Sequence, residues 1–336
     1  MDWFEKLTGF KEEVYAFTRA RLTVEGYRLR SLVNGKSYNT GHLELAPLSE
    51  LRDRVNSADP LSGKLRVSII SGDVREMHRR PEFAGALFQV ASQFNLLEMI
   101  GPNKTPEDGV TIYQSDRTQG PACAMAAGAA TIYRNYFAEV GGQFGQTQDR
   151  QLDALADVGA LLSERLKMPV GSLWTMRNGY ALCSRPGLDA ITDILQNSTE
   201  TEKDQLRGKL RIGLHRDVEV TDTAHPLPVV SQAFCSALPV AYGEVPSRHW
   251  GAFAKLVLEA AYEATLWATV LNAQRGGSRT VLLTSLGGGA FGNDESWIEA
   301  ALTRALQLAC AFELDVRLVS YGPPSPMFTR MAQAYS

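Results

Sequence analysis

Residues 281–299 read Val281-Leu-Leu-Thr-Ser-Leu-Gly-Gly-Gly-Ala-Phe-Gly-Asn-Asp-Glu-Ser-Trp-Ile-Glu299, and they carry the strongest structural signal in the chain. The apolar run from Val281 to Leu286 predicts a buried strand, and the apolar-periodic run that begins at Trp297 predicts a helix. Between the two stand Gly287, Gly288, Gly289 and Gly292. A plain strand-to-helix turn needs only one or two glycines. Four therefore favour a bound anion, because bare backbone N–H groups and a helix N-terminus attract phosphate.

The spacing Gly287-x-Gly289-x-x-Gly292 also matches the dinucleotide-binding fingerprint. In a dinucleotide-binding fold this turn follows the first strand, and several strands come after it. Here one predicted strand, Asp315–Tyr321, remains, so an NAD(P)-dependent oxidoreductase is kept as the lesser alternative. A P-loop is excluded because no Lys-Ser or Lys-Thr follows the last glycine. A nucleophile elbow around Ser285 lacks its first glycine, since Leu283 stands there.

Length and composition are those of a globular protein with one large domain or two ordinary ones. The chain has 336 residues, 44% of them hydrophobic, and a formal net charge of −3. This charge predicts no nucleic-acid partner and no attraction to an anionic membrane. A long apolar run, Leu256–Val270, is interrupted by Glu259 and Glu263, so no membrane span is expected.

The cysteines and histidines point to no metal site. Their spacing fits no zinc motif, and far-apart cysteines suit free thiols in a reducing compartment. We expect no metal and no cofactor. The N-terminus carries acids at Asp2 and Glu5, where a signal peptide needs a basic start and an apolar run. The sequence therefore predicts a cytoplasmic protein.

The last hundred residues alternate strand and helix, which predicts an α/β fold with helices on both faces of a largely parallel sheet. The predicted strands are Leu65–Val74, Leu210–His215, Val229–Leu238, Val281–Leu286 and Asp315–Tyr321. The main predicted helices are Trp250–Leu271 and Trp297–Leu308. Phe83–Asn95 is compatible with either a strand or a helix.

The remaining segments are predicted to be accessory. Residues 1–60 are charged, and two helices are expected there, Glu5–Arg19 and Leu48–Val55, forming a cap or lid. Further helices are predicted over Leu152–Leu166 and Gly187–Leu206. Ser172–Cys183 predicts a hairpin whose two-residue turn is Asn178-Gly179.

Several polar or aromatic residues directly follow predicted strands. Ligands of α/β sheets bind beyond the carboxyl ends of the strands, so Asp73, the glycine loop and Tyr321 are expected to share one crevice. Asp73 alone also fits an ordinary turn or helix cap. A dense polar cluster, Asp116-Arg-Thr-Gln119, precedes the small-residue run Pro121–Thr131, which permits very close packing.

Together these pieces resemble the macrodomain, the ADP-ribose-binding α/β/α fold. Four segments are similar to family landmarks and occur in the same order: Ile70-Ser-Gly-Asp73-Val, Val90-Ala-Ser-Gln-Phe-Asn95, Leu283-Thr-Ser-Leu-Gly-Gly-Gly-Ala-Phe-Gly292 and Val316-Arg-Leu-Val-Ser-Tyr321. The resemblance implies a three-layer α/β/α mixed sheet in residues 61–336, with residues 1–60 as a helical extension and an insertion at about 140–210.

The chain departs from the usual macrodomain in its first loop. A long segment follows Asn95, and Thr118-Gln-Gly-Pro-Ala-Cys-Ala replaces a run of glycines. Asp108 and Asp116, eight residues apart, and Thr118-Gln-Gly-Pro resemble the divergent glycohydrolase-like branch. That branch includes the MavL-type effector hydrolases, which remove ADP-ribose from arginine.

The resemblance implies a role for each site residue. Asp116 is expected to be the catalytic carboxylate, with Asp108 as its partner and Asn95 orienting the distal ribose. Asp73 is expected to accept from adenine and Tyr321 to stack on it. The other expected ligand-binding residues are Val74, Gln119, Gly287, Gly288, Gly289, Ala290, Phe291 and Gly292. For either carboxylate, a solvated or loop-capping acid is the simpler alternative.

The implied activity is hydrolysis of ADP-ribose from a modified protein, with ADP-ribose and that protein as the partners. Cleavage at the distal ribose passes through an oxocarbenium-like transition state, which a nearby carboxylate and a positioned water stabilise. A reader that binds ADP-ribose without cleaving it is the alternative.

Overall fold

A mixed sheet forms the centre of the computed structural model, which describes residues 1–58 and 61–335. In that part of the chain the sheet has seven strands, in the order β4 (His42–Pro47), β11 (Arg211–Glu219), β12 (Val229–Cys235), β6 (Leu87–Ala91), β13 (Thr280–Leu283), β14 (Asp315–Ser320) and β5 (Arg66–Ser71). The pairs β4–β11 and β11–β12 are antiparallel, and the others are parallel. Five neighbouring strands, from β12 to β5, therefore end at one edge among the described residues.

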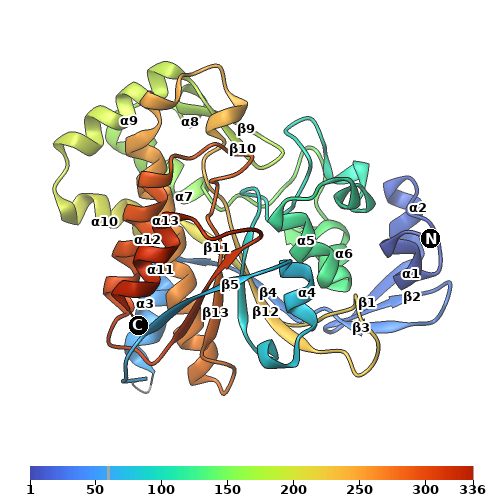
Figure 1. Cartoon of the computed structure of the whole chain (residues 1–336). Coiled ribbons are helices and arrows are strands. Elements are labelled where there is room, and N and C mark those ends of the chain that lie inside the picture. Colours follow the sequence, from blue (N-terminus) through green and yellow to red (C-terminus); the bar gives the residue numbers. More distant parts are fainter. Residues whose placement is uncertain (59–60, 336) are drawn as a thin grey trace.

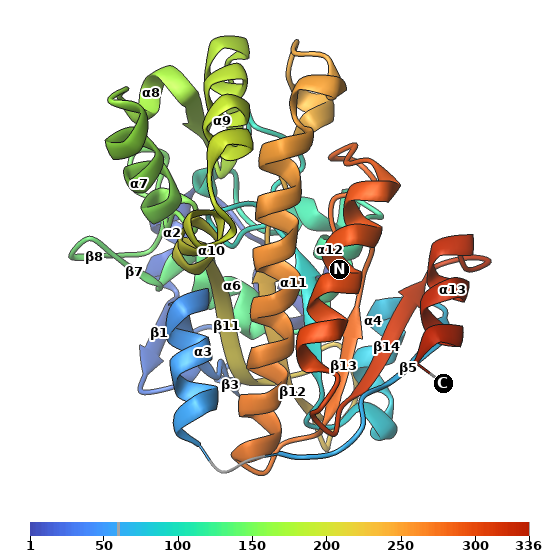
Figure 2. The ribbon, with the colours of Figure 1, turned by 90° about the vertical axis from the view of Figure 1, so that its left-hand side faces the viewer.

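Helices cover both faces of this sheet (Figures 1 and 2). One layer contains α3 (Leu48–Ser57), α11 (Gly251–Gln274), α12 (Glu295–Ala309) and α13 (Pro326–Ala334), and the other α4 (Val74–Arg79), α5 (Gln119–Ala126) and α6 (Gly128–Tyr136). Successive strand residues alternate between the layers: Leu283 packs in the cluster with α11 and α12, and Leu282 in the cluster with α4 and α5. The expected α/β class is confirmed.

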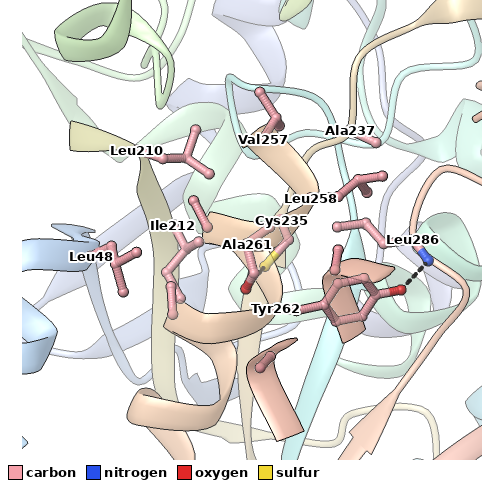
Figure 3. Packing of buried hydrophobic residues seen from close by; sticks show 14 of the residues in the cluster. Leu48, Leu210, Ile212, Cys235, Ala237, Val257, Leu258, Ala261, Tyr262 and Leu286 are labelled. Atoms are coloured by element: carbon pink, nitrogen blue, oxygen red, sulfur yellow. Dashed lines mark hydrogen bonds between the residues drawn. The ribbon is translucent and has the colours of Figure 1, made fainter. Parts of the chain in front are cut away.

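The glycine loop after β13 is held in place by the long helix α11. Fully buried Tyr262 accepts a hydrogen bond from the Leu286 N–H at 2.9 Å and donates one to the Thr284 carbonyl at 2.7 Å. Figure 3 shows the Tyr262 ring reaching from the helix to Leu286, among apolar side chains that include Leu258 and Cys235. The loop therefore starts from a fixed point in the core.

The N-terminal segment is helical only in part. Its helices are α1 (Trp3–Thr8), α2 (Tyr15–Ala20) and α3, and the strands β1 (Leu22–Glu25), β2 (Arg28–Ser31) and β3 (Ser37–Asn39) form a small antiparallel sheet. The prediction of one helix over Glu5–Arg19 is wrong, because Gly9 ends α1 in the left-handed conformation, with φ of 82°. We place a domain boundary after residue 60, and residues 59–60 lie outside the part of the chain that the structure describes.

The N-terminal segment packs against α6 and the adjoining loop. Trp3 and Phe4 share a buried cluster with Tyr113 and Ile132. The Glu12 carboxylate accepts hydrogen bonds from the backbone N–H groups of residues 110 and 111, at 2.8 and 2.6 Å. It also accepts one from the Tyr136 hydroxyl at 2.7 Å. The segment thus braces the loop that precedes α5.

A second group of elements stands between α6 and β11, outside the central sheet. It contains β7 (Glu139–Val140), β8 (Gln143–Phe144), α7 (Ala156–Leu166), α8 (Val170–Leu173), β9 (Trp174–Arg177), β10 (Tyr180–Cys183), α9 (Arg185–Asn197) and α10 (Glu200–Lys209). The predicted hairpin is confirmed, with Arg177 opposite Tyr180 and positive φ at Asn178 and Gly179. The predicted helix over Gly187–Leu206 is two helices, because Thr199 caps α10.

The other predicted elements agree in type with the structure. The ambiguous segment Phe83–Asn95 contains strand β6, and the helix predicted over Leu48–Val55 is α3. Short helical turns complete the described chain: η1 (Pro81–Phe83), η2 (Pro106–Asp108), η3 (Thr111–Ser115), η4 (Val240–Tyr242) and η5 (Ser247–His249). Within residues 1–58 and 61–335, no helix combines the length and the apolar character that crossing a bilayer requires.

Candidate functional site

A cavity of about 640 Å³ opens at the edge where the parallel strands end. Five strands each contribute a residue that lies just beyond their carboxyl end, and these are Asp73, Ser92, Ala237, Thr284 and Tyr321. The volume lies within the range of pockets that bind cofactors and drug-sized ligands. The expected convergence of Asp73, the glycine loop and Tyr321 in one crevice agrees with this geometry.

The glycine loop presents free donors to the cavity. The N–H groups of Gly287, Gly289, Ala290 and Phe291 donate to no acceptor within the described part of the chain. Gly287 has φ of 72°, and a Cβ there would lie 2.4 Å from the Ala237 Cβ. Gly289 faces open space, and no heavy atom would lie within 4 Å of its Cβ. The loop is therefore a group of donors suited to an anion.

The N-terminus of α5 is a second source of free donors. The N–H groups of Gln119 and Gly120 have no acceptor among the described residues, and both residues line the cavity. Close packing fixes this end, because a Cβ on Gly120 would lie 1.9 Å from the Ala91 carbonyl oxygen. The Gln119 side chain accepts from the Ala91 N–H and donates to the Gln89 carbonyl, at 2.9 and 2.7 Å.

Gln119 therefore continues the hydrogen-bonding pattern of β6 and holds α5 against it. Since both ends of its amide are occupied by backbone, we expect it to position the helix, and its backbone N–H is the group left for a ligand. Arg117, just before α5, is exposed, lines the cavity and pairs with no acid in the described part of the chain. A cation beside free N–H groups adds to the attraction for an anion.

Glu98 is the buried carboxyl group of the cavity wall. Its side chain is fully buried, and burial raises the pKa of the Glu98 carboxyl from 4.5 to about 7, although Arg134 opposes the rise. The turn that carries Glu98 is pinned by the Gln93 side chain, which accepts from the Met99 N–H at 2.8 Å and donates to the Met99 carbonyl at 3.2 Å. A carboxyl group with this pKa exists in both protonation states near neutral pH.

Asp116 is the second carboxyl group at the cavity. It is partly exposed and accepts a hydrogen bond from the Thr118 N–H at 2.8 Å. This bond fixes the bend that leads into α5. The site thus holds a buried acid and a more exposed one, which is the pairing that general acid–base chemistry uses.

Three aromatic side chains form a wall of the same cavity. Tyr180 comes from strand β10, Tyr242 from η4 and Phe291 from the glycine loop, and their ring centroids lie 5.1 to 5.5 Å apart. The Tyr180 hydroxyl donates to the Met99 carbonyl at 2.9 Å, next to Glu98. Burial, Tyr242 and Asp116 together raise the pKa of Tyr180. The wall therefore lines the same cavity as Glu98 and Asp116.

The other end of the cavity carries Asp73, Val74 and Tyr321. The Asp73 carboxylate accepts from the Arg75 N–H at 2.8 Å and so caps α4. Tyr321 is 84% exposed and is one of the residues that line the cavity. Arg75 also lines the cavity and pairs with Asp222. An exposed aromatic ring beside a carboxylate is suited to a flat, hydrogen-bonding ligand group.

Some of the predicted site residues do not line the cavity. Asn95 is fully buried, donates to the Gln151 side chain at 2.8 Å and accepts from the Leu97 N–H at 3.1 Å. Asp108 caps the turn η2 through the Thr105 N–H and pairs with Lys104 at 3.1 Å. Gly288 and Gly292 belong to the loop and not to the cavity lining.

Asn95 and Asp108 thus have structural partners, and neither lines the cavity to which Asp116 belongs. The Asp108 geometry corresponds to the loop-capping alternative that the sequence left open. Their expected catalytic roles are therefore not carried further.

Glu98, Tyr180 and Tyr242 line the cavity but were not predicted from the sequence as site residues. Glu98 had one signal, because a single acid inside the apolar run Leu96–Ile100 must be either paired or functional. The two tyrosines had none, since they enter the cavity from segments far apart in the sequence. Within residues 1–58 and 61–335, no group of three His, Cys, Asp or Glu residues is arranged to hold a metal ion.

The comparisons with known proteins found similarities among solved structures. No protein-family model matches the chain, and no curated protein does. A poly(ADP-ribose) glycohydrolase from Thermomonospora curvata aligns with a TM-score of 0.44 and 14% identity, covering 95% of this chain and 97% of that one. The same enzyme bound to the inhibitor ADP-HPD gives a TM-score of 0.43, with the same identity and coverage.

A poly(ADP-ribose) glycohydrolase from Deinococcus radiodurans, in complex with ADP-ribose, aligns with a TM-score of 0.43 and 12% identity. The match covers 87% of this chain and 94% of that one. At these scores and identities, no residue role follows from the similarity. The function proposed below therefore rests on the residues that line the cavity.

Proposed function

We propose that this protein is an ADP-ribosylhydrolase, which removes ADP-ribose from a modified protein by hydrolysis at the distal ribose. The observation that carries the proposal is the meeting of two acids, Glu98 and Asp116, with two groups of free backbone N–H donors in one cavity. We also propose that the chain is a divergent macrodomain of the MavL-type branch. Free cysteines support action in the reducing cytoplasm.

The ligand is proposed to lie along the cavity, with its adenine at one end. Adenine would stack on Tyr321, and its amino group would donate a hydrogen bond to the Asp73 carboxylate. The diphosphate would accept from the N–H groups of the glycine loop and of the α5 N-terminus, with Arg117 adding positive charge. The distal ribose would then reach Glu98 and Asp116, because these acids line the same cavity.

Hydrolysis requires a group that passes a proton and a group that stabilises positive charge. The bond from the ribose C1 to the leaving atom breaks, and its electron pair goes to the leaving atom. Water oxygen bonds to C1, one water proton goes to a carboxylate, and a proton reaches the leaving atom. Glu98, with a pKa of about 7, is suited to the proton transfers. Asp116 is suited to stabilising the oxocarbenium-like transition state.

We further propose arginine as the modified residue. The wall formed by Tyr180, Tyr242 and Phe291 lines the same cavity as both acids, and aromatic faces near a carboxylate attract a planar cation. A guanidinium group has that character, whereas an ester to aspartate or glutamate, or an O-glycosidic bond to serine, carries no positive charge at the linkage.

The test combines calorimetry with a cleavage assay. We expect ADP-ribose to bind more tightly than AMP or NAD, and ADP-ribosyl-arginine to be cleaved faster than the aspartate, glutamate or serine conjugates. Binding without cleavage of any linkage would make the protein a reader. Binding of NAD(P)H in place of ADP-ribose would support the oxidoreductase alternative.

A further inference from the structure

A fully buried arginine stands directly behind Glu98. Arg134 lies on α6 with its side chain 0% exposed, and its two Nη2 contacts to the Glu98 carboxylate oxygens are both 3.4 Å. The two residues are 36 positions apart in the chain. Residue Glu98 thus lines the cavity, and its fully buried carboxylate contacts a guanidinium.

The Arg134 guanidinium is held from several directions. Its Nε donates to the Leu96 carbonyl at 3.1 Å, and its Nη2 also donates to the Thr131 hydroxyl at 3.1 Å. Its Cζ lies 3.8 Å from the centre of the Phe234 ring. Nη1 lies 3.3 Å from Nδ1 of His215. These contacts come from separate elements, so the guanidinium has little freedom to follow a moving carboxyl group.

The other titratable groups around Glu98 are uncharged. Tyr113, from η3, accepts a hydrogen bond from the Glu98 N–H, and burial raises its pKa well above the ordinary value. Burial likewise raises the pKa of Cys123 on α5. Burial and Arg134 lower the pKa of His215 on β11 well below 6.5, so this ring is neutral. Arg134 is therefore the charged group that faces Glu98 in the described residues.

We propose that Arg134 is a positioning residue, whose anchored guanidinium holds the Glu98 carboxyl in place beside the cavity and favours its charged form. This inference rests on the proposed hydrolase function. The pair is loose at 3.4 Å and is therefore compatible with either charge state of the carboxyl group. Burial favours the neutral acid and Arg134 favours the carboxylate, so removing Arg134 leaves burial unopposed.

The variants that test this are Arg134→Met, which removes the charge, and Arg134→Lys, which keeps it without the planar fork. The Glu98 carboxyl is titrated by ¹³C NMR of glutamate side chains, with Glu98→Gln identifying its signal. The pH profile of kcat is measured on ADP-ribosyl-arginine. Arg207→Met is the matched control, because Arg207 is also a buried, ion-paired arginine but is bonded to Glu259 on the opposite layer.

We expect Arg134→Met to raise the midpoint of the Glu98 titration by one pH unit or more. The limb of the kcat profile that belongs to Glu98 should move to higher pH by the same amount, while KM changes less than threefold. Arg134→Lys should give a smaller shift of the same sign. Arg207→Met should leave both the titration and the profile in place.

A folded Arg134→Met protein with an unchanged titration and profile would overturn the proposal. If that variant does not fold, the absence of any shift in Arg134→Lys would overturn it equally. A wild-type protein that cleaves no linkage, while its Glu98 signal still shifts when Arg134 is replaced, would refute the hydrolase function alone and leave the coupling between the two residues in place.

Discussion

Glu98 combines two properties that a side chain rarely has together. It is fully buried between Leu97 and Met99, which are buried apolar residues, and it also lines the cavity. Burial raises the pKa of its carboxyl group to about 7. A group of this kind loses little when a ligand displaces water, because its own hydration has already been given up in folding.

The first prediction concerns Glu98→Gln. The amide keeps the shape and removes the transferable proton, so the cleavage rate should fall by about 100-fold or more. Affinity for ADP-ribose should stay within about threefold, since the diphosphate donors are untouched. Single-turnover cleavage and calorimetry measure the two quantities.

Asp108→Asn is the matched control for that measurement. Asp108 caps the turn η2 outside the cavity, so its loss should cost stability and leave the cleavage rate within about twofold. Equal losses of cleavage in Glu98→Gln and Asp108→Asn would contradict the assignment of Glu98.

The second prediction concerns Tyr321→Ala. The ring is exposed in the free protein, so its removal should not destabilise the fold. Base–aromatic stacking contributes on the order of 1–3 kcal/mol. Affinity for ADP-ribose should therefore fall roughly tenfold, whereas affinity for ribose 5-phosphate, which lacks a base, should not change. Parallel losses for both ligands would place adenine elsewhere.

At the scale of elements, α5 and β6 depend on close contact between backbones. Gly120→Ala would place a methyl group against the Ala91 carbonyl oxygen and push the helix N-terminus away from the strand. Overpacking of this kind costs about 1–3 kcal/mol. We expect a lower melting temperature and weaker binding of ADP-ribose, measured by calorimetric scanning and titration.

Gly289→Ala serves as the comparison, because its methyl group would enter open space. Its melting temperature should match that of the wild type. A similar drop in both variants would show that the tight contact at residue 120 is not the cause.

The elements that were predicted correctly carry a strong local signal. The strand over residues 281–286 and the Asn178-Gly179 hairpin are specified by their own residues, and the ends of parallel strands meet at one edge in any such sheet. The small sheet β1–β3 was missed because its strands are short and polar. Glu98 and the tyrosine wall depend on partners distant in the sequence, and no local pattern encodes that meeting.

At the scale of the whole molecule, buried ionisable groups oppose one another as pH changes. The pKa of Glu98 is raised from 4.5 to about 7, so its contribution to stability is full below pH 4.5 and is lost as pH rises through 7. The pKa of His78 is lowered by burial from 6.5 to about 4, so folding gains stability as pH rises from 4 to 6.5. The two effects partly cancel between pH 4.5 and 6.5.

Glu98→Gln should remove the pH-dependent contribution of Glu98 to the free energy of unfolding. Relative to the wild type, its free energy of unfolding should increase by up to about 3 kcal/mol between pH 4.5 and 7, at 1.36 kcal/mol per pKa unit. Urea unfolding at several pH values measures the difference. Replacement of the exposed Glu82 by Gln should give a curve parallel to that of the wild type. A parallel curve for Glu98→Gln would contradict the raised pKa.

The Glu12 carboxylate reaches across from the N-terminal segment to the backbone of residues 110 and 111 and to the Tyr136 hydroxyl. The segment that leads to Asp116 is therefore anchored by a residue almost a hundred positions earlier in the chain. A truncation that makes the chain begin at β4 would keep every described strand of the central sheet, but it would remove Glu12 and its hydrogen bonds to that segment. A shortened protein of this kind would retain its hydrophobic core and lose the proposed hydrolase activity.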